Sequence, residues 1–336
     1  MKRIPQLDSV RALAVIAVFL FHSLGVKLLW AGVDLFFILS GFLITNVLLE
    51  AKRLTLGSYF GHFYARRVRR ILPPYVLTLA VVSLFVGVGW THYWYLYILL
   101  TNLLYPLHIQ IPVAFGPLWS LAVEEQFYLA WPFAVYFLTE RQLRSVSMLL
   151  IVIAPLLRAT IHFSDPWVMY MLTPFRMDLL ASGALLCLVW RNKPEVITER
   201  GSAVGISLLA LGLATFAVLG QLGITKNANT ATSNVLVYEA SLAVCFGFIL
   251  YALAGRRVGW LRLGALRFVG KISFTMYLVH QGILELLRHS LKGIPLTLVG
   301  LLVALVYASL SWYLMERRLL QAPEKPTLPV KTIPIT

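Results

Sequence analysis

The chain has 336 residues, of which 59 % are hydrophobic and only 13 % are charged, and its mean hydropathy is +0.80. Soluble domains average about 45–50 % apolar and about 25 % charged residues, so this composition excludes a soluble protein and predicts a polytopic membrane protein. The net charge of +15 would suggest a nucleic-acid partner in a soluble chain. Here we expect none, because Lys and Arg collect in the cytoplasmic loops of membrane proteins.

Apolar stretches follow one another along the whole chain, each close to the ~20 residues that cross a bilayer as a helix. The first lacks a small-residue cleavage site and is not expected to be a removable signal peptide. We expect an all-α domain over residues 1–320 with ten transmembrane helices, followed by an irregular, Pro-rich tail over 321–336. The expected helices lie near 10–30, 33–50, 72–90, 118–138, 146–163, 172–191, 203–222, 235–254, 270–289 and 296–315.

The positive charges orient these helices. Ten crossings place most of the 29 Lys and Arg residues on the side of the N-terminus, in the loops 51–70, 191–200 and 255–271 and in the tail. Positively charged loops face the cytoplasm, so we expect both termini there and a multi-pass protein of the bacterial cytoplasmic (inner) membrane. The same rule makes 224–234 an external loop.

One further apolar segment, 92–108, is expected not to cross. A crossing there would place Arg141, Arg191 and Arg256 outside. Its many Tyr and Trp residues favour an interfacial or re-entrant segment, because such rings prefer the headgroup level.

Two ionisable residues stand out in the first helix. Arg11 and His22 are eleven residues apart, which is three helical turns plus about 20°, so they share one face and lie about 16 Å apart along the axis. Ionisable groups inside a bilayer usually face a cavity or a partner. A functional His22 is therefore the favoured interpretation, and a snorkelling Arg11 with a buried, hydrogen-bonded His22 is the alternative.

Further segments carry an unusual density of polar residues within apolar surroundings. They are GVDLFFILSGFLI (32–44), RRVRRILPPY (66–75), LWSLAVEEQFYLAWP (118–132), TPFRMDLLASGALL (173–186), GKISFTMYLVH (270–280) and MERRL (315–319). Together with the R-x10-H spacing of Arg11 and His22, and in this order, they resemble the motifs of the acyltransferase-3 family of integral membrane acyltransferases. Phe274 stands where the family usually has Tyr, and Arg318 stands where it usually has Pro, so the last match is weak.

The resemblance implies transfer of an acyl group, usually acetyl, from cytoplasmic acyl-coenzyme A to a hydroxyl, with no metal. A compact chain without an appended domain resembles the acetylases of O-antigen and exopolysaccharide, so the expected acceptor is a surface polysaccharide or its lipid-linked precursor. The chain is expected to complete the transfer alone or with a separate partner protein. Acylation of a small molecule such as a macrolide is one alternative. A secondary transporter is another, although we find no internal repeat and no matched pair of broken helices.

The arginine segment is the expected donor site. Arg binds phosphate through a planar fork of donors, and coenzyme A carries several phosphate charges. Arg66, Arg67, Arg69 and Arg70 are therefore expected to bind acyl-coenzyme A, with Arg11 and Lys271 joining from neighbouring helices. From the residues alone, a positive-inside anchor is the favoured explanation of this cluster. The resemblance to the family motif changes the preference to phosphate binding.

The expected catalytic set is His22, Glu124 and Arg11. Imidazole removes a proton from an alcohol near neutral pH, so His22 is expected to act as general base, although an acyl-imidazole relay uses the same residue. Glu124 is expected to orient His22, as a carboxylate does in hydrolase triads. The alternative is a carboxylate stabilised by the start of its helix.

The remaining polar residues of the motifs are assigned to the acceptor. They are Asp34, Arg176, Asp178, Tyr277 and His280, each with a structural hydrogen bond or ion pair as the alternative. Ser40 and Gly41 are expected to allow close helix packing. Cys187 and Cys245 are expected to be packing residues. The whole scheme predicts one water-lined passage that joins the arginines to His22.

Overall fold

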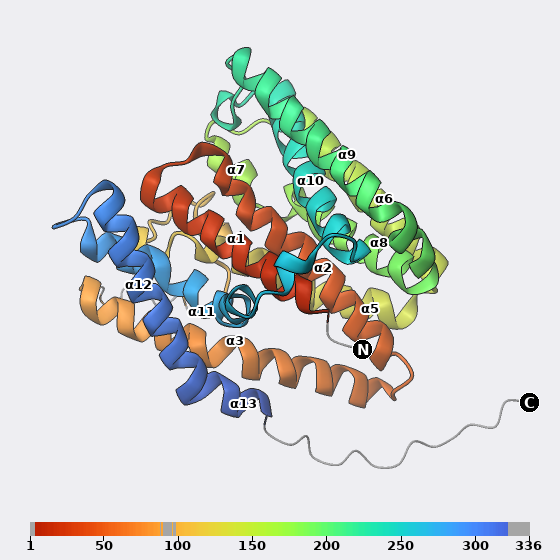
Figure 1. Cartoon of the computed structure of the whole chain (residues 1–336), viewed down its shortest axis with the longest axis horizontal. Helices are drawn as coiled ribbons and strands as arrows, with labels where there is room; N and C mark the ends of the chain where they lie inside the picture. The colour runs from red at the N-terminus through yellow and green to blue at the C-terminus, as the bar shows by residue number, and fades with distance from the viewer. Residues whose placement is uncertain (1–3, 88, 90–95, 97–98, 322–336) are drawn as a thin grey trace, which may run out of the picture.

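The computed structural model describes residues 4–87, 89, 96 and 99–321, and every regular element within them is helical (Figure 1). A long helix overlaps each of the ten predicted stretches. These helices are α1 (Pro5–Leu24), α2 (Gly32–Ala51), α3 (Leu56–Val86), α5 (Leu118–Phe137), α6 (Glu140–Thr160), α8 (Met177–Asn192), α9 (Pro194–Gln221), α10 (Ala231–Ala254), α11 (Gly264–Leu287) and α12 (Gly293–Ser311). The short helices are α4 (Thr101–Leu104), α7 (Pro166–Met171) and α13 (Arg317–Gln321).

Within the described residues, seven helical stretches are long and apolar enough to cross a membrane. They are Pro5–Leu24, Lys27–Ala51, Leu56–Val86, Glu140–Thr160, Pro194–Gln221, Ala231–Ala254 and Gly293–Gln321. The polytopic, all-helical prediction is confirmed. Ten crossings and cytoplasmic termini remain predictions, since α5, α8 and α11 are not among the seven stretches.

Several predicted boundaries are wrong. Helix α1 ends at Leu24 rather than near 30, and α6 begins at Glu140 rather than near 146. Helix α3 begins at Leu56 rather than near 72, so the arginine motif is helical and Pro73 and Pro74 lie inside the helix. Prolines are tolerated in membrane helices because neighbouring groups satisfy the freed carbonyls. Helix α9 begins at Pro194 rather than near 203. Proline is well suited to the first position of a helix, because that position needs no backbone N–H donor. Helix α11 begins at Gly264, within the predicted loop 255–271.

Two predicted segments lie wholly or partly outside the described residues. In 92–108, residues 92–95, 97 and 98 lie outside, and the described remainder contains the four-residue helix α4. In the predicted tail, residues 322–336 lie outside. That 92–108 does not cross, and that the tail is irregular, therefore stay predictions.

Close helix contacts fix the centre of the molecule. Helix α2 packs on α8, where the backbone of Leu180 lies so close to Gly41 that it leaves no space for a side chain. Helix α1 packs on α11, where Gly270 meets the backbone of Asp8 in the same way. Small residues allow such approaches in membranes, and the predicted role of Gly41 is confirmed. Cys187 and Cys245 are buried and unpaired by any disulfide, in agreement with a packing role.

The outer helices lie on either side of this centre. Helices α6, α9 and α10 form one side of the molecule, and α3 and α12 lie on the opposite side, with α13 beside α3 (Figure 1). Glu316, in the π-helical turn Trp312–Glu316, accepts hydrogen bonds from Thr275 Oγ1 (2.7 Å) and Ser311 Oγ (2.8 Å). The closing motif thus ties the C-terminal segment to α11 and holds α13 against α3.

Candidate active site

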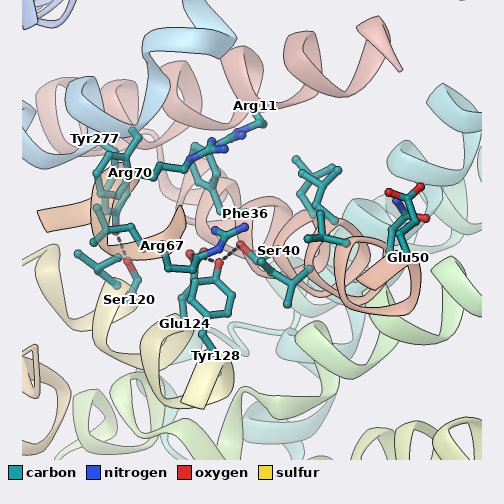
Figure 2. Close-up of a pocket in the computed structure, with 18 residues that line it drawn as sticks. Arg11, Phe36, Ser40, Glu50, Arg67, Arg70, Ser120, Glu124, Tyr128 and Tyr277 are labelled. Atoms are coloured by element: carbon teal, nitrogen blue, oxygen red, sulfur yellow. Dashed lines mark hydrogen bonds between the residues drawn. The ribbon is translucent and has the colours of Figure 1, made fainter. Parts of the chain in front are cut away.

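A cavity of about 360 Å³ lies between α1, α2, α3, α5 and α11 (Figure 2). The side chains that α2 contributes run from Phe36 to Glu50, a length of about 21 Å at 1.5 Å per residue. Arg11, Arg67, Arg70 and Glu124 also line it. In Figure 2 Glu50 marks one end of the group of lining residues, and Tyr277 and Ser120 mark the other. The cavity is therefore long, and it combines positive charge with an apolar wall.

The middle of this cavity is polar. The hydroxyl of Tyr128 donates to Glu124 Oε2 at 2.9 Å and lies 2.9 Å from Ser40 Oγ (Figure 2). The guanidinium of Arg67 lies 5.0 Å from the centre of the Tyr128 ring, within the range of a cation–π contact. Ser40 thus faces the cavity, and the prediction that it serves helix packing is wrong.

A second cavity, of about 350 Å³, adjoins the first beside the arginine motif. It is lined by Arg66, Arg67, Arg69 and Arg70 together with Val47, Phe63, Leu319 and Leu320. Arg67, Arg70 and Val47 line both cavities, so the two are neighbours. The four arginines gather here because their positions fall within ~160° around α3. Lys271, predicted to join them, lines neither cavity.

His22 lies beyond the far end of the first cavity and does not line it. Its Nδ1 is 2.9 Å from the carbonyl oxygen of Val18 and 3.2 Å from His280 Nε2. The Nδ1 of His280 is 2.6 Å from the carbonyl oxygen of Tyr277. The structure thus brings together two histidines that are far apart in the sequence and that sequence reasoning assigned to different roles.

Tyr277 separates the first cavity from this histidine pair. Its ring centre is 5.7 Å from that of Phe36, which lines the cavity, and 5.4 Å from that of His280. Its hydroxyl donates to the carbonyl of Pro117 at 3.0 Å and lies 2.6 Å from Ser120 Oγ. Neither cavity reaches His22, and the Tyr277 ring lies beside both the Phe36 ring and the His280 ring. The continuous passage from the arginines to His22 therefore stays a prediction.

Glu124 does not take its predicted place beside His22. It contacts Tyr128, one turn further along α5, and shares the first cavity with Arg11. His22 lies about 16 Å further along α1 than Arg11. The two residues of the R-x10-H spacing therefore lie at different sites. Arg11 lines the first cavity, and His22 lies on the other side of the Tyr277 ring.

Three residues predicted to bind the acceptor are buried in ion pairs instead. Arg176 pairs with Asp34, and Ser241 Oγ donates to the same carboxylate at 2.6 Å. Asp178 pairs with Arg158 at 2.6 Å. Asp34 and Arg176 are 0 % exposed, so neither reaches an acceptor in this conformation. Charged groups within a bilayer require such partners, which is why the second helix and α8 carry them.

Sequence reasoning missed Arg158 and Glu239 as members of this network. The guanidinium of Arg158 donates to Glu239 Oε1 at 2.6 Å, to Asp178 and to the carbonyl oxygen of Phe175 at 2.5 Å. The signal was present, because an arginine in the apolar stretch 146–163 must have a buried partner. Its partners on other helices are set by packing.

Lys226 was also missed. It lies in the short segment Lys226–Ala228, between the candidate spans that end at Gln221 and begin at Ala231. Its Nζ is 3.7 Å from the ring centre of Tyr170 and 4.3 Å from that of Trp167. Burial, and then the charge of Arg176, lower the pKa of Lys226 from 10.5 to about 7, against the opposing effect of Asp34.

This shift predicts a pH dependence of stability. Between about pH 7 and 10.5 the unfolded chain holds a proton on Lys226 that the folded chain has lost, so stability rises with pH across this window. Below pH 7 the cost of burying the charge is present in full. We expect Lys226→Met to raise the melting temperature by on the order of 5 °C at pH 6 and much less at pH 10. Thermal unfolding of the two proteins in detergent across this range measures it. A difference that did not change with pH would contradict the shift.

Comparisons with known proteins agree with this architecture. Residues 4–316 match the family model of the acyltransferase-3 acyltransferase domain. The chain is 30 % identical to the peptidoglycan O-acetyltransferase OatA of Listeria monocytogenes over 85 % of this chain and 50 % of that protein. It is 28 % identical to the putative peptidoglycan O-acetyltransferase YrhL of Bacillus subtilis, over 94 % of this chain and 54 % of YrhL. It is also 28 % identical to the O-acetyltransferase OatA of Staphylococcus aureus, over 93 % and 56 %.

The chain spans about half the length of these curated relatives. No solved structure matches it. The family model, however, covers nearly the whole sequence and includes every motif named above except the last three residues of MERRL (315–319). The chain therefore belongs to the acyltransferase-3 family.

Proposed function

We propose that the chain is a membrane O-acyltransferase that moves an acetyl group from cytoplasmic acetyl-coenzyme A to a hydroxyl of a cell-surface glycan. The observation that carries this proposal is the arrangement of the two cavities. An arginine-lined cavity adjoins a long, partly apolar one whose inner end lies against a pair of histidines. This order suits a donor that carries phosphates at one end and a thioester at the other.

In this scheme the arginine cavity holds the phosphates of the donor. Arg66 and Arg69 line only that cavity, and Arg67 and Arg70 stand where it adjoins the first. Guanidinium groups bind phosphate oxygens through paired, charge-assisted hydrogen bonds. The uncharged arm of the donor then lies along α2, between Glu50 and Phe36, with its thioester next to Tyr277.

The chemical step uses His22. When the Tyr277 ring moves aside, the thioester meets an acceptor hydroxyl at the histidine pair. The Nε2 of His22 takes the hydroxyl proton as the oxygen attacks the thioester carbonyl carbon. The carbon–sulfur bond then breaks, and the leaving thiolate takes the proton from Nε2, which gives the acetyl ester and free coenzyme A. His22 as general base needs no covalent intermediate, and we prefer it to an acyl-imidazole relay.

For the acceptor we propose peptidoglycan ahead of O-antigen, exopolysaccharide or a lipid-linked precursor. The sequence alone favoured the last three, but similar relatives from Listeria monocytogenes and Bacillus subtilis are named for peptidoglycan. We place the protein in the bacterial cytoplasmic membrane, with the donor cavities facing the cytoplasm.

The decisive experiment incubates the purified protein in liposomes with labelled acetyl-coenzyme A and peptidoglycan fragments. We expect free coenzyme A to be released only when the peptidoglycan fragments are present. The label is expected to appear in the glycan in the same amount. Lipopolysaccharide, exopolysaccharide and a macrolide in place of the fragments test the other acceptors. Movement of an unmodified solute across the vesicle without coenzyme A release would instead indicate a transporter.

The arginine cavity gives a prediction about donor binding. We expect Arg66→Gln together with Arg69→Gln to raise KM for acetyl-coenzyme A by about 10- to 100-fold and to leave kcat within about twofold. A hydrogen bond to a charged group contributes about 1.5–3 kcal/mol, and these two side chains lie far from the thioester. Steady-state kinetics of coenzyme A release measures the change.

Arg53→Gln is the matched control, because Arg53 is an exposed residue near the start of the same helix and lines neither cavity. Equal KM values for the double variant and the control would place the phosphates elsewhere.

A further inference from the structure

We propose that His280 is the positioning residue of His22, so that a histidine–histidine pair does the work that a histidine–carboxylate pair does in hydrolase triads. The inference rests on the proposed function, in which His22 is the base. It assigns to His280 a role in the chemical step, where the sequence suggested contact with the acceptor.

The hydrogen bonds fix where the protons lie. A carbonyl oxygen only accepts, so His280 Nδ1, 2.6 Å from the carbonyl of Tyr277, carries a hydrogen. The Nε2 of neutral His280 is then a bare acceptor. By the same argument His22 Nδ1, 2.9 Å from the carbonyl of Val18, carries a hydrogen, which also points to His280 Nε2 at 3.2 Å. The Nε2 of neutral His22 is left as a free lone pair, which is the form that a general base requires.

His280 also provides what the Val18 carbonyl does not. When His22 takes the acceptor's proton, its ring becomes positively charged and its Nδ1–H becomes a stronger donor. An imidazole nitrogen is a more basic acceptor than a carbonyl oxygen, so His280 Nε2 stabilises that charge and spreads it over two rings. In hydrolases a buried aspartate has this task. Here Glu124 is held by Tyr128 in the first cavity, and the hydrogen-bond partners of the His22 ring among the described residues are the Val18 carbonyl and His280.

The electrostatic setting makes this help necessary. Arg288 donates to the backbone carbonyl of His22 at 2.6 Å and thereby places a positive charge near the ring, which its ion pair with Glu285 at 3.4 Å offsets only in part. A second positive charge on His22 is therefore costly unless its partner shares it. The pair is also held rigidly, because α1 and α11 pack closely along their length and the backbones of Gly270 and Asp8 touch.

The test compares two amides that differ in length. In His280→Gln the amide oxygen reaches the place of Nε2 and still accepts from His22 Nδ1. In His280→Asn the shorter side chain reaches only the place of Nδ1 and leaves His22 without its second acceptor. We expect kcat to fall about 100-fold in His280→Asn and no more than about 10-fold in His280→Gln, with KM for acetyl-coenzyme A unchanged in both. His162→Asn, at an exposed histidine outside the site, is expected to match the wild type.

A second measurement is independent of activity. Nitrogen-15 spectra of ring-labelled histidine, with His22→Ala to assign the signal, report which ring nitrogen carries the hydrogen. We expect Nδ1–H and a bare Nε2 for His22 in the wild type and in His280→Gln, and a mixture of both forms in His280→Asn. Thermal unfolding confirms that the two amides fold equally well.

The possible failures are distinguishable. A wild-type protein that transfers no acetyl group would overturn the proposed function, while the nitrogen spectra would still test the pair. An active wild type with equal kcat in His280→Asn, or with equally large losses in the two amide variants, would overturn the role of His280.

Discussion

Replacing His22 with Ala is expected to lower kcat for acetyl transfer by about 100- to 10,000-fold, the range in which a general base contributes. The alcohol of the acceptor is a poor nucleophile until its proton is removed. In this structure the bare Nε2 of His22 is the base proposed for that proton, on the far side of the Tyr277 ring from the donor cavity. Release of coenzyme A from labelled acetyl-coenzyme A, with acceptor present, measures the loss.

The binding of the donor serves as the internal control for this variant. Acetyl-coenzyme A is expected to bind His22→Ala with unchanged affinity, because His22 does not line either cavity. His62→Ala, on α3, is expected to keep wild-type kcat. Transfer at the wild-type rate in His22→Ala would remove His22 from the mechanism. Label that stays on the wild-type protein when acceptor is left out would instead favour the acyl-imidazole relay.

The second large effect concerns folding. We expect Arg176→Met to lower the free energy of unfolding by about 3–5 kcal/mol, since breaking a buried ion pair leaves the Asp34 carboxylate uncompensated. Combining it with Asp34→Asn is expected to recover much of that loss. The neutral amide no longer needs a cation and can still bond to Ser241. Thermal unfolding of the single and double variants in detergent measures both effects.

This comparison also decides between the two interpretations of Arg176. If Arg176 bound acceptor hydroxyls, as its motif suggested, Arg176→Met would unfold at the wild-type temperature. Its KM would rise for the acceptor and not for acetyl-coenzyme A. Asp34→Asn would then give no recovery in the double variant.

The sequence predicted those features of the fold that are set by residues close together in the chain. The number and places of the long helices follow from apolar stretches, and the arginines gather because they share one side of α3. Gly41 packs as expected because a glycine within a membrane helix marks a close approach. The start of α3 was missed because a basic, aromatic stretch resembles a loop by composition although it is compatible with a helix.

The partners of single side chains could not be predicted in this way. His22 and His280 meet because α1 and α11 pack together, and Ser40 faces the cavity because Gly41, its neighbour, turns toward α8. A helical period places residues on a face, but it does not say which other helix that face meets. Glu124, Asp34 and Arg176 were assigned to the reaction for this reason, although each had several possible partners.

The ring of Tyr277 has a consequence for the cell as well as for the reaction. A channel that stayed open across the membrane would let protons and small ions flow down their gradients. The membrane potential would then collapse. The described cavity ends instead at a ring whose hydroxyl contacts both Pro117 and Ser120. In the proposed reaction, which joins two aqueous compartments, such a closure would keep ions from crossing the membrane between one transfer and the next.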